Sequence, residues 1–149
     1  MTTLKIGDKA PGFSVKDQHG KIINLEDFKG KKVVLFFYPK ASTPGCTAEA
    51  CNLRDNYHTF QNKGYEILGV SADSEKRQMN FSTKQELPYS LLADEDKEVI
   101  MAYGVWGPKK FMGREYDGIY RTTFVIDEEG KIEDVITKVK TKDHSAQIL

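Results

Sequence analysis

The sequence passes directly from a long apolar run into a helix-start signal, and this order of features restricts the fold more than any other. Residues 32–38, with the sequence KVVLFFY, are rich in β-branched and aromatic side chains and predict a buried strand. Pro39 ends that strand because it has no N–H to donate to a neighbouring strand. Thr43 is a favoured N-cap residue, and Pro44 suits the first position of a helix. The pattern therefore predicts a strand, a short loop and a helix.

Cys46 falls in the first turn of this predicted helix. The unpaired backbone N–H groups of a first turn and the positive end of the helix dipole both favour an anion. Cysteines at helix N-termini accordingly ionise more readily than free cysteine, and the thiolate is the nucleophilic form. The position of Cys46 alone therefore predicts an activated sulfur.

The predicted helix has one apolar face, and Cys46 belongs to it. Spacings of four, three, four and three residues define this face, which consists of Cys46, Ala50, Leu53, Tyr57 and Phe60. Cys51 follows Cys46 by five residues, which places it about 140° around the helix. A disulfide requires Cα atoms within about 7 Å and converging Cβ vectors. If Cys46 and Cys51 pair, the first turns of the helix must therefore unwind.

Length and charge exclude several other classes of protein. Because the chain has 149 residues, positions 1–149 are predicted to form a single domain. Its 22 basic residues balance its 22 acidic residues, so charge gives no reason to expect nucleic acid or an anionic membrane as a partner. No apolar run approaches a membrane span and no signal peptide is evident, so we expect a cytoplasmic protein. In such a chain, two cysteines are expected to be catalytic rather than structural.

The remaining patterns predict an α/β protein that begins with a β-hairpin. Strands are predicted at 13–16 and 21–24 (the hairpin), 65–72, 90–93, and 118–126 with 131–137 (a second hairpin). Helices are predicted at 25–30, 44 to about 63, 73–86, from Asp94 or Asp96 to 104, and 143–149. Residues 105–117 are predicted to form a loop. The alternation of strands and helices indicates parallel crossovers. His19, in the turn of the first hairpin, is predicted to be solvated.

The segment around Cys46 resembles the active-site motif of the peroxiredoxins. Pro39, Thr43 and Cys46 match its pattern P-x-x-x-[ST]-x-x-C, and Cys51 matches the second cysteine of the bacterioferritin-comigratory-protein (PrxQ) subfamily. The resemblance covers nearly the whole chain, with one departure: Ala-Ser at 41–42 stands where many members carry acidic residues. It implies a thioredoxin-like fold, in which helices flank a mixed central sheet.

The resemblance also implies a reaction. A thiol peroxidase would reduce H2O2 and organic hydroperoxides through Cys46, the peroxidatic residue, which becomes a sulfenic acid. Cys51, the resolving residue, would convert it to a transient intrachain Cys46–Cys51 disulfide after local unwinding of the helix. Thioredoxin or a similar dithiol protein would then reduce that disulfide. The expected protein is a monomer without a cofactor, and two cysteines without clustered histidines also give no zinc site.

Five further residues receive roles from the resemblance. Arg121 matches the family's distant active-site arginine, whose fork would hold both the thiolate and the peroxide. Thr43 would bind the peroxide through its hydroxyl, and the N–H of Gly45 would point at the same spot. Pro39 would shield the sulfur from water. Glu49, one helical turn after the sulfur, would orient Arg121.

Four of the candidate residues also have a simpler interpretation. Thr43 would be only an N-cap, and Arg121 an exposed strand arginine. Glu49 would be a solvated first-turn acid, and Cys51 a small half-buried apolar residue.

Two other functions compete with the peroxidase. A thiol-disulfide oxidoreductase of the thioredoxin type would be expected to carry Cys-x-x-Cys, whereas four residues separate the cysteines here. A non-enzymatic thioredoxin-fold module for redox sensing or binding would not need Thr43, Cys46 and Arg121 together.

Overall fold

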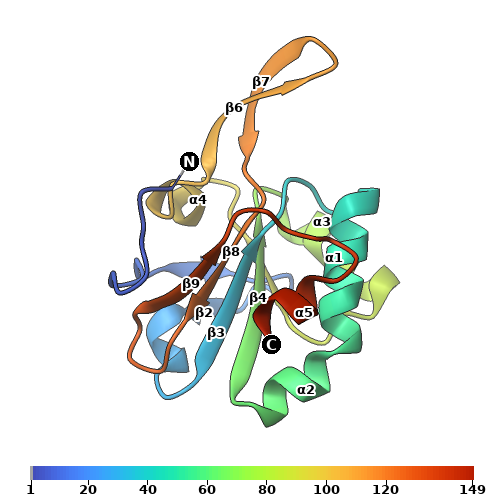
Figure 1. Ribbon diagram of the computed structural model, residues 1–149. Helices are drawn as coiled ribbons and strands as arrows, with labels where there is room; N and C mark the ends of the chain where they lie inside the picture. Colours follow the sequence, from blue (N-terminus) through green and yellow to red (C-terminus); the bar gives the residue numbers. More distant parts are fainter. Residues whose placement is uncertain (1) are drawn as a thin grey trace.

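A five-stranded mixed sheet forms the centre of the computed structural model, which describes residues 2–149 (Figure 1). In spatial order its strands are β5 (Ser90–Ala93), β4 (Tyr65–Ser71), β3 (Lys32–Phe37), β8 (Thr122–Ile126) and β9 (Ile132–Ile136). β3, β4 and β5 are parallel, whereas β8 is antiparallel to both of its neighbours. The carboxyl ends of the three parallel strands therefore lie at one edge of the sheet.

The central strand β3 is buried on both faces. Val33, Leu35 and Phe37 belong to one core cluster, while Val34 and Phe36 belong to a second cluster on the other side of the sheet. Successive side chains of a strand point to opposite faces, so a strand covered on both sides needs apolar residues at every position. This is why the strand reads as a continuous apolar run.

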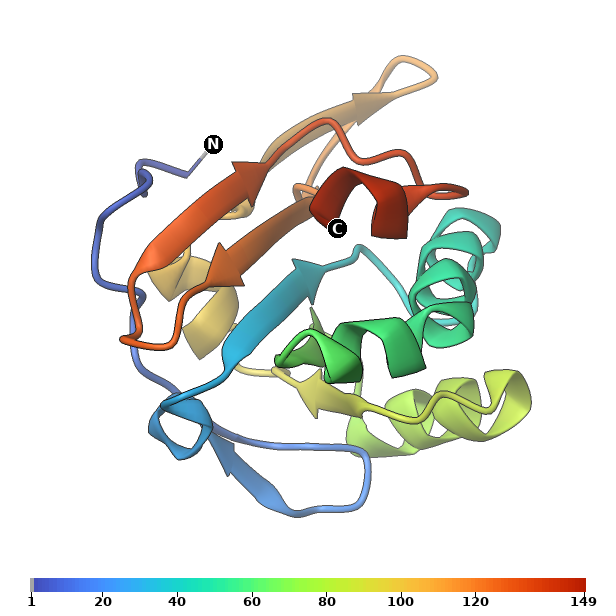
Figure 2. The ribbon, with the colours of Figure 1, turned by 60° about the horizontal axis from the view of Figure 1, so that its bottom comes forward.

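Helices cover both faces of the sheet. The helices on the face that carries the second cluster are α1 (Pro44–Asp55), α2 (Tyr57–Asn62), α3 (Glu75–Gln85) and α5 (His144–Ile148), and Figure 2 shows α5 beside α1. The other face carries η1 (Leu25–Phe28), α4 (Glu98–Ala102) and the hairpin of β1 (Ser14–Lys16) and β2 (Ile22–Asn24). The predicted N-terminal hairpin is present, and His19 in its turn is exposed as predicted. Across residues 2–149 no helix has the length and apolar character needed to cross a membrane.

The predicted cysteine helix, from 44 to about 63, is in fact two helices. α1 and α2 are separated by Asn56, which has φ −109° and ψ 8°. The Asn56 side-chain amide donates to the Asn52 carbonyl at 2.8 Å. Asparagine side chains that bond to nearby backbone compete with helical bonding in this way. The prediction of one continuous helix was wrong, although the apolar face continues across the break to the buried Phe60.

Most of the predicted loop at 105–117 is in fact an additional hairpin, which was not predicted, so the prediction of a loop was wrong. β6 (Trp106–Phe111) pairs antiparallel with β7 (Arg114–Ile119), and the pair projects from the body of the molecule (Figure 1). Met112 and Gly113 form its turn with φ of 52° and 81°, the combination that a two-residue hairpin turn requires.

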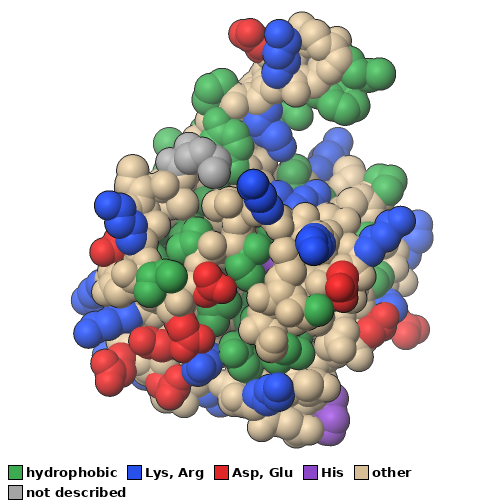
Figure 3. Space-filling view, in the orientation of Figure 1, with side chains coloured by type: hydrophobic (Ala, Val, Ile, Leu, Met, Phe, Trp, Pro, Cys, Tyr) green, Lys and Arg blue, Asp and Glu red, His purple; other side chains and the backbone are tan. Residues whose placement is uncertain are grey.

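Two features of β6 concealed this hairpin in the sequence. Gly107 and Pro108 lie inside the strand, and both residues normally interrupt strands. The hairpin is also largely exposed, so it lacks an alternating apolar pattern. At its tip Phe111 and Met112 are 65% and 88% exposed, and Figure 3 shows hydrophobic side chains gathered there.

The predicted strand 118–126 is interrupted, and the interruption positions Arg121. β7 ends and β8 begins two residues apart, so Tyr120 and Arg121 lie between the strands. The Tyr120 backbone N–H donates to the Val105 carbonyl at 2.7 Å, and its hydroxyl donates to the Pro108 carbonyl at 2.8 Å. These bonds fix the junction between the hairpin and the sheet.

Candidate active site

The first turn of α1 places Cys46 in the interior of the protein. Cys46 is the third residue of α1, and its side chain is only 1% exposed. Thr43 precedes the helix with an extended backbone, φ −82° and ψ 156°, as an N-cap residue does. The sulfur therefore lies where the helix dipole favours a negative charge.

The Thr43 hydroxyl does not cap this helix. It donates instead to the Lys40 carbonyl at 2.8 Å, across a turn in which Ser42 has a left-handed φ of 66°. Side-chain capping therefore does not account for this threonine. Because the hydroxyl proton is already donated, the Thr43 oxygen is left as a hydrogen-bond acceptor beside the first turn of α1.

Asp73 holds the loop that precedes Thr43, a role that the sequence did not reveal. The Asp73 Oδ2 accepts a hydrogen bond from the Ala41 backbone N–H at 2.8 Å and one from the Ser71 hydroxyl at 2.7 Å. The sequence placed Asp73 at the start of α3, but the residue that caps α3 is Ser74, whose side chain accepts from the Arg77 N–H. An acidic residue after a strand suits either role, so sequence alone did not separate them.

Arg121 joins Cys46 to Glu49. One terminal nitrogen, Nη2, lies 3.3 Å from the Cys46 Sγ, and the other, Nη1, donates to Glu49 Oε1 at 2.6 Å. A planar guanidinium is suited to bridge two acceptors in this way. Glu49 is fully buried, and the Arg121 side chain is 22% exposed, so neither residue is a solvated surface charge.

Gly45 lets the guanidinium approach the helix. A Cβ placed on Gly45 would lie 3.3 Å from the Arg121 Nη2, which is closer than most side chains tolerate. A residue with a side chain at 45 would therefore press on the nitrogen that contacts the sulfur. The structure thus brings Gly45, Glu49 and Arg121 together at Cys46.

The electrostatics of this cluster reflect its burial. Burial raises the pKa of Glu49 from 4.5 to about 7, although the neighbouring Arg121 acts to lower it. Burial by itself would lower the pKa of Arg121, but the adjacent Cys46 and Glu49 outweigh it and leave that pKa raised. The guanidinium is therefore the permanent cation of the site.

His144 is a member of this cluster that the sequence did not indicate. It is the first residue of α5 and is fully buried, with Nε2 3.4 Å from Glu49 Oε2 and 2.7 Å from Thr123 Oγ1. Its other ring nitrogen, Nδ1, lies 2.7 Å from Gln147 Oε1. A single histidine near the end of the chain carries no spacing signal that links it to Glu49.

Cys51 points to a different neighbour from Cys46. It is half-buried, and its thiol donates to Gln85 Oε1 on α3 at 3.4 Å. Both cysteines are free in this structure, with α1 intact around them. This agrees with the expectation that an intact helix keeps the two sulfurs apart.

The remaining candidate, Pro39, is half-buried two residues after the end of β3. Its position at the start of the loop that leads to Cys46 is consistent with a shielding role, which stays a prediction.

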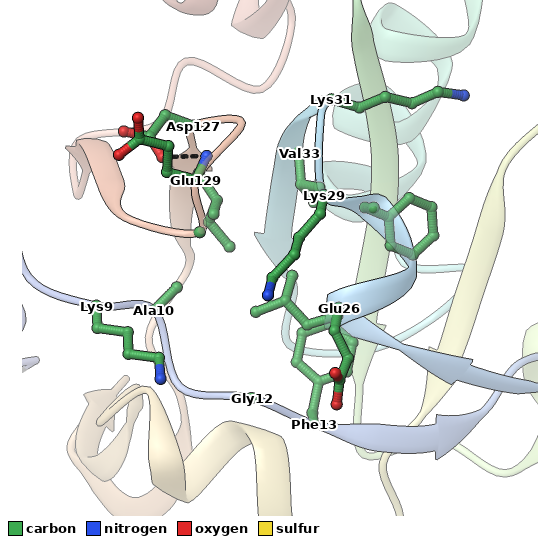
Figure 4. Close-up of a pocket in the computed structure, with 14 residues that line it drawn as sticks. Lys9, Ala10, Gly12, Phe13, Glu26, Lys29, Lys31, Val33, Asp127 and Glu129 are labelled. Carbon is green, nitrogen blue, oxygen red and sulfur yellow. Dashed lines mark hydrogen bonds between the residues drawn. The ribbon is translucent and has the colours of Figure 1, made fainter.

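A pocket elsewhere in the molecule contains none of these residues. It has a volume of about 230 Å³ and lies at the opposite end of β3 from Cys46, where Val33 and Ile126 form part of its wall (Figure 4). Lys9, Lys29, Glu26 and Asp127 line it as well, so its charges are mixed. The candidate catalytic residues therefore form a compact cluster separate from this pocket.

Comparisons with known proteins show the family of this chain. The sequence profile of the AhpC/TSA family matches residues 6–135. Peroxiredoxin Bcp of Escherichia coli (strain K12) is 49% identical over 149 residues, which cover 100% of this chain and 96% of that protein.

Solved structures show the same relationship. A mutant of Xylella fastidiosa PrxQ superimposes with a TM-score of 0.93 at 28% identity, covering 99% of this chain and 94% of that one. The bacterioferritin comigratory protein of Xanthomonas campestris, studied for its alkyl peroxide reduction activity, gives a TM-score of 0.87 at 32% identity and covers 99% and 94% of the two chains. The chain described here therefore belongs to the AhpC/TSA family, within the bacterioferritin-comigratory-protein (PrxQ) subfamily of peroxiredoxins.

Proposed function

We propose that this peroxiredoxin reduces H2O2 and organic hydroperoxides through a two-cysteine cycle in which Cys46 is peroxidatic and Cys51 is resolving. The observation that carries this proposal is the Arg121 guanidinium, which contacts the Cys46 Sγ at 3.3 Å and is held by Glu49 on its other side. A cation fixed beside a buried sulfur in a first helical turn favours the thiolate.

In the first step the Cys46 thiolate attacks one oxygen of the hydroperoxide. An S–O bond forms as the O–O bond breaks, and the departing oxygen takes up a proton and leaves as water or an alcohol. Arg121 stabilises the negative charge that develops on this oxygen. Thr43 supplies an acceptor for the hydroperoxide O–H, since its own proton is donated to the Lys40 carbonyl. The sulfur ends as a sulfenic acid.

In the second step the Cys51 thiol attacks that sulfenic acid. An S–S bond forms, water leaves, and the product is an intrachain disulfide. Because an i,i+5 pair in a helix cannot meet this geometry, the first turns of α1 unwind. The Cys51 contact with Gln85 must also break.

In the third step a dithiol protein reduces the disulfide by exchange, and we propose thioredoxin or a similar protein for this role. Two free thiols are required to start each cycle, which favours a reducing compartment such as the cytoplasm. A single chain contains both cysteines and Arg121, so the cycle is proposed for a monomer, without nucleic acid or a membrane as partner.

Rapid mixing of the reduced protein with H2O2 tests this cycle, with the fluorescence of the single tryptophan, Trp106, as the signal. Mass spectrometry should show the loss of two hydrogens in the wild type. Cys46→Ser should abolish the reaction, and Cys51→Ser should leave a sulfenic acid and stop turnover with a dithiol reductant. Oxidation of the wild type no faster than that of a free thiol would reject the peroxidase function.

A further inference from the structure

One oxygen of the buried Glu49 carboxyl lacks a hydrogen bond. Oε1 accepts from Arg121, but Oε2 is the one buried side-chain nitrogen or oxygen without a hydrogen-bond partner among residues 2–149. The nearest candidate is His144 Nε2, at 3.4 Å. An unsatisfied polar atom in a fully buried position is unfavourable, so the state of this pair needs a physical explanation.

The surroundings of His144 determine which ring nitrogen carries the proton. The Gln147 side-chain N–H₂ donates to the Lys138 carbonyl at 2.9 Å, and Gln147 Oε1 accepts from the Lys140 N–H at 2.8 Å. This orientation presents the Gln147 oxygen, an acceptor, to His144 Nδ1 at 2.7 Å. Nδ1 must therefore carry a hydrogen.

With its hydrogen on Nδ1, a neutral His144 presents a lone pair from Nε2. The Thr123 hydroxyl, 2.7 Å away, donates to that lone pair, so Nε2 has no hydrogen to offer an ionised Glu49 Oε2 at 3.4 Å. One added proton supplies the missing donor, because either Oε2 or Nε2 can then donate toward the other. Two added protons would leave the Oε2 hydrogen without an acceptor, because Nε2 would then be a donor as well.

We propose that Glu49 Oε2 and His144 Nε2 share one proton in the reduced enzyme at neutral pH, and that His144 is a positioning residue for Arg121. The proposal deepens the peroxidase function and rests on it for its catalytic consequence. With the proton present, Glu49 and His144 together are neutral, and Arg121 offers its charge to the sulfur. Without it, an extra negative charge faces Arg121 and competes with the Cys46 thiolate.

The other charged or titratable groups near the pair are few. Cys46 lies on α1, Arg121 lies between β7 and β8, and the buried Tyr89 hydroxyl donates to the Ala50 carbonyl at 2.7 Å. Lys109 on β6 donates to the Ile119 carbonyl at 2.9 Å and lies within the electrostatic reach of Arg121 and Cys46. None of them supplies a donor to Glu49 Oε2.

The direction of each pKa agrees with a single shared proton. Burial raises the pKa of Glu49 to about 7 and lowers the pKa of His144 below 6.5. The carboxyl therefore holds a proton more tightly than usual, and the imidazole more weakly. Because the two groups are in contact, their titration belongs to the pair rather than to either residue.

The proposal predicts a pH profile that a purely structural role would not produce. As pH rises through the titration of the pair, the proton is lost and Glu49 becomes negatively charged. The second-order rate constant for H2O2 should then fall by about tenfold, because Glu49 competes with the Cys46 thiolate for the charge of Arg121. His144→Gln offers Glu49 Oε2 an amide N–H, which favours the ionised carboxylate and so lowers the pKa of Glu49 from about 7. The alkaline decline of this variant should therefore move to lower pH, and at pH 6.5 the variant should react more slowly than wild type by up to about tenfold. His58→Gln, at an exposed histidine of α2, is the matched control and should keep the wild-type profile.

Rapid-mixing rates from pH 5.5 to 9 are the first measurement, and a His144→Gln profile with the same alkaline decline as wild type would overturn the proposal.

Nuclear magnetic resonance of the reduced wild type is the second measurement, because it needs no activity and no variant. We expect the Glu49 carboxyl carbon and the His144 ring to titrate together, with the neutral ring protonated at Nδ1. A Glu49 carboxyl that remains ionised down to pH 5 would refute the shared proton. If the wild type fails to react with peroxide but the two groups titrate together, the peroxidase function fails and the shared proton stands.

Discussion

Replacement of Arg121 by alanine should slow the reaction with H2O2 by a factor that the structure allows to be estimated. At the 3.3 Å between Nη2 and Sγ, two unit charges attract by about 5 kcal/mol at an effective dielectric constant of about 20. Part of this is lost because Arg121 also donates to Glu49 and is 22% exposed. A usable share of about 3 to 4 kcal/mol corresponds to a rate lower by about 10² to 10³.

The fold should survive this replacement. Arg121 is the group that opposes protonation of Glu49, so without it the pKa of the buried carboxyl rises further and the carboxyl is protonated and neutral. Arg121→Lys separates charge from geometry, because one ammonium cannot reproduce the fork that contacts Glu49 and Cys46 at once. We expect an intermediate rate for this variant.

Rapid mixing with H2O2, followed by Trp106 fluorescence, measures both variants, and thermal unfolding checks that each is folded. Arg114→Ala on the exposed hairpin is the control for the loss of an arginine and should leave the rate unchanged. A folded Arg121→Ala protein that reacts at the wild-type rate would refute the electrostatic argument.

Three further predictions follow from individual contacts. Because the pKa of Glu49 is raised from 4.5 to about 7, the folded state binds a proton more tightly than the unfolded state does. The free energy of unfolding should therefore fall by about 3 kcal/mol as pH rises through this range. Denaturant titrations at pH 5 and pH 8 measure this fall, which Glu49→Gln should abolish. Gly45→Ala should raise the free energy of unfolding by up to about 1 kcal/mol, because alanine has the higher helix propensity. It should also slow the peroxide reaction, because its Cβ presses on Arg121. A thermal melt tests the gain in stability, and rapid mixing of the same sample tests the loss of rate. Asn52→Ala removes the side-chain bonds to the Ser145 N–H at 2.7 Å and to the Lys142 carbonyl at 3.1 Å. Hydrogen exchange of α5 should therefore accelerate, and the disulfide should form faster because α5 packs beside the helix that must unwind. Unchanged exchange would show that α5 is held by other contacts.

The sequence predicted the elements whose local pattern allows few alternatives. The continuous apolar run of β3 and the Thr-Pro start of α1 lie within a few residues of their predicted limits, because burial on two faces and helix-start chemistry leave little alternative. The thioredoxin-like architecture is confirmed by the mixed sheet and by the structural relatives. The β6–β7 hairpin was missed because it packs on little else, so no buried face imposed a pattern on its residues.

The candidate site was predictable only where it is local in sequence. Thr43, Gly45, Cys46 and Glu49 belong to one short segment, and their spacing on a helix indicates a shared location. Arg121 entered only through the family resemblance. His144 and Asp73 were not found, because the contacts that define them arise when distant parts of the chain pack together, and nothing in their neighbours marks them.

The long-range contacts around Cys46 also have a consequence for biosynthesis. Arg121 reaches Glu49 and Cys46 across 72 and 75 residues of chain. Contacts of such high sequence separation are slow to form, because a long loop must close first. During translation, therefore, the cysteine emerges from the ribosome well before its arginine, and the guanidinium that contacts the sulfur joins the site late. On the proposed function, the Arg121 contact with the sulfur is complete only after β8 has paired with β3, so we expect the unfolded nascent chain to react with peroxide more slowly than the folded protein.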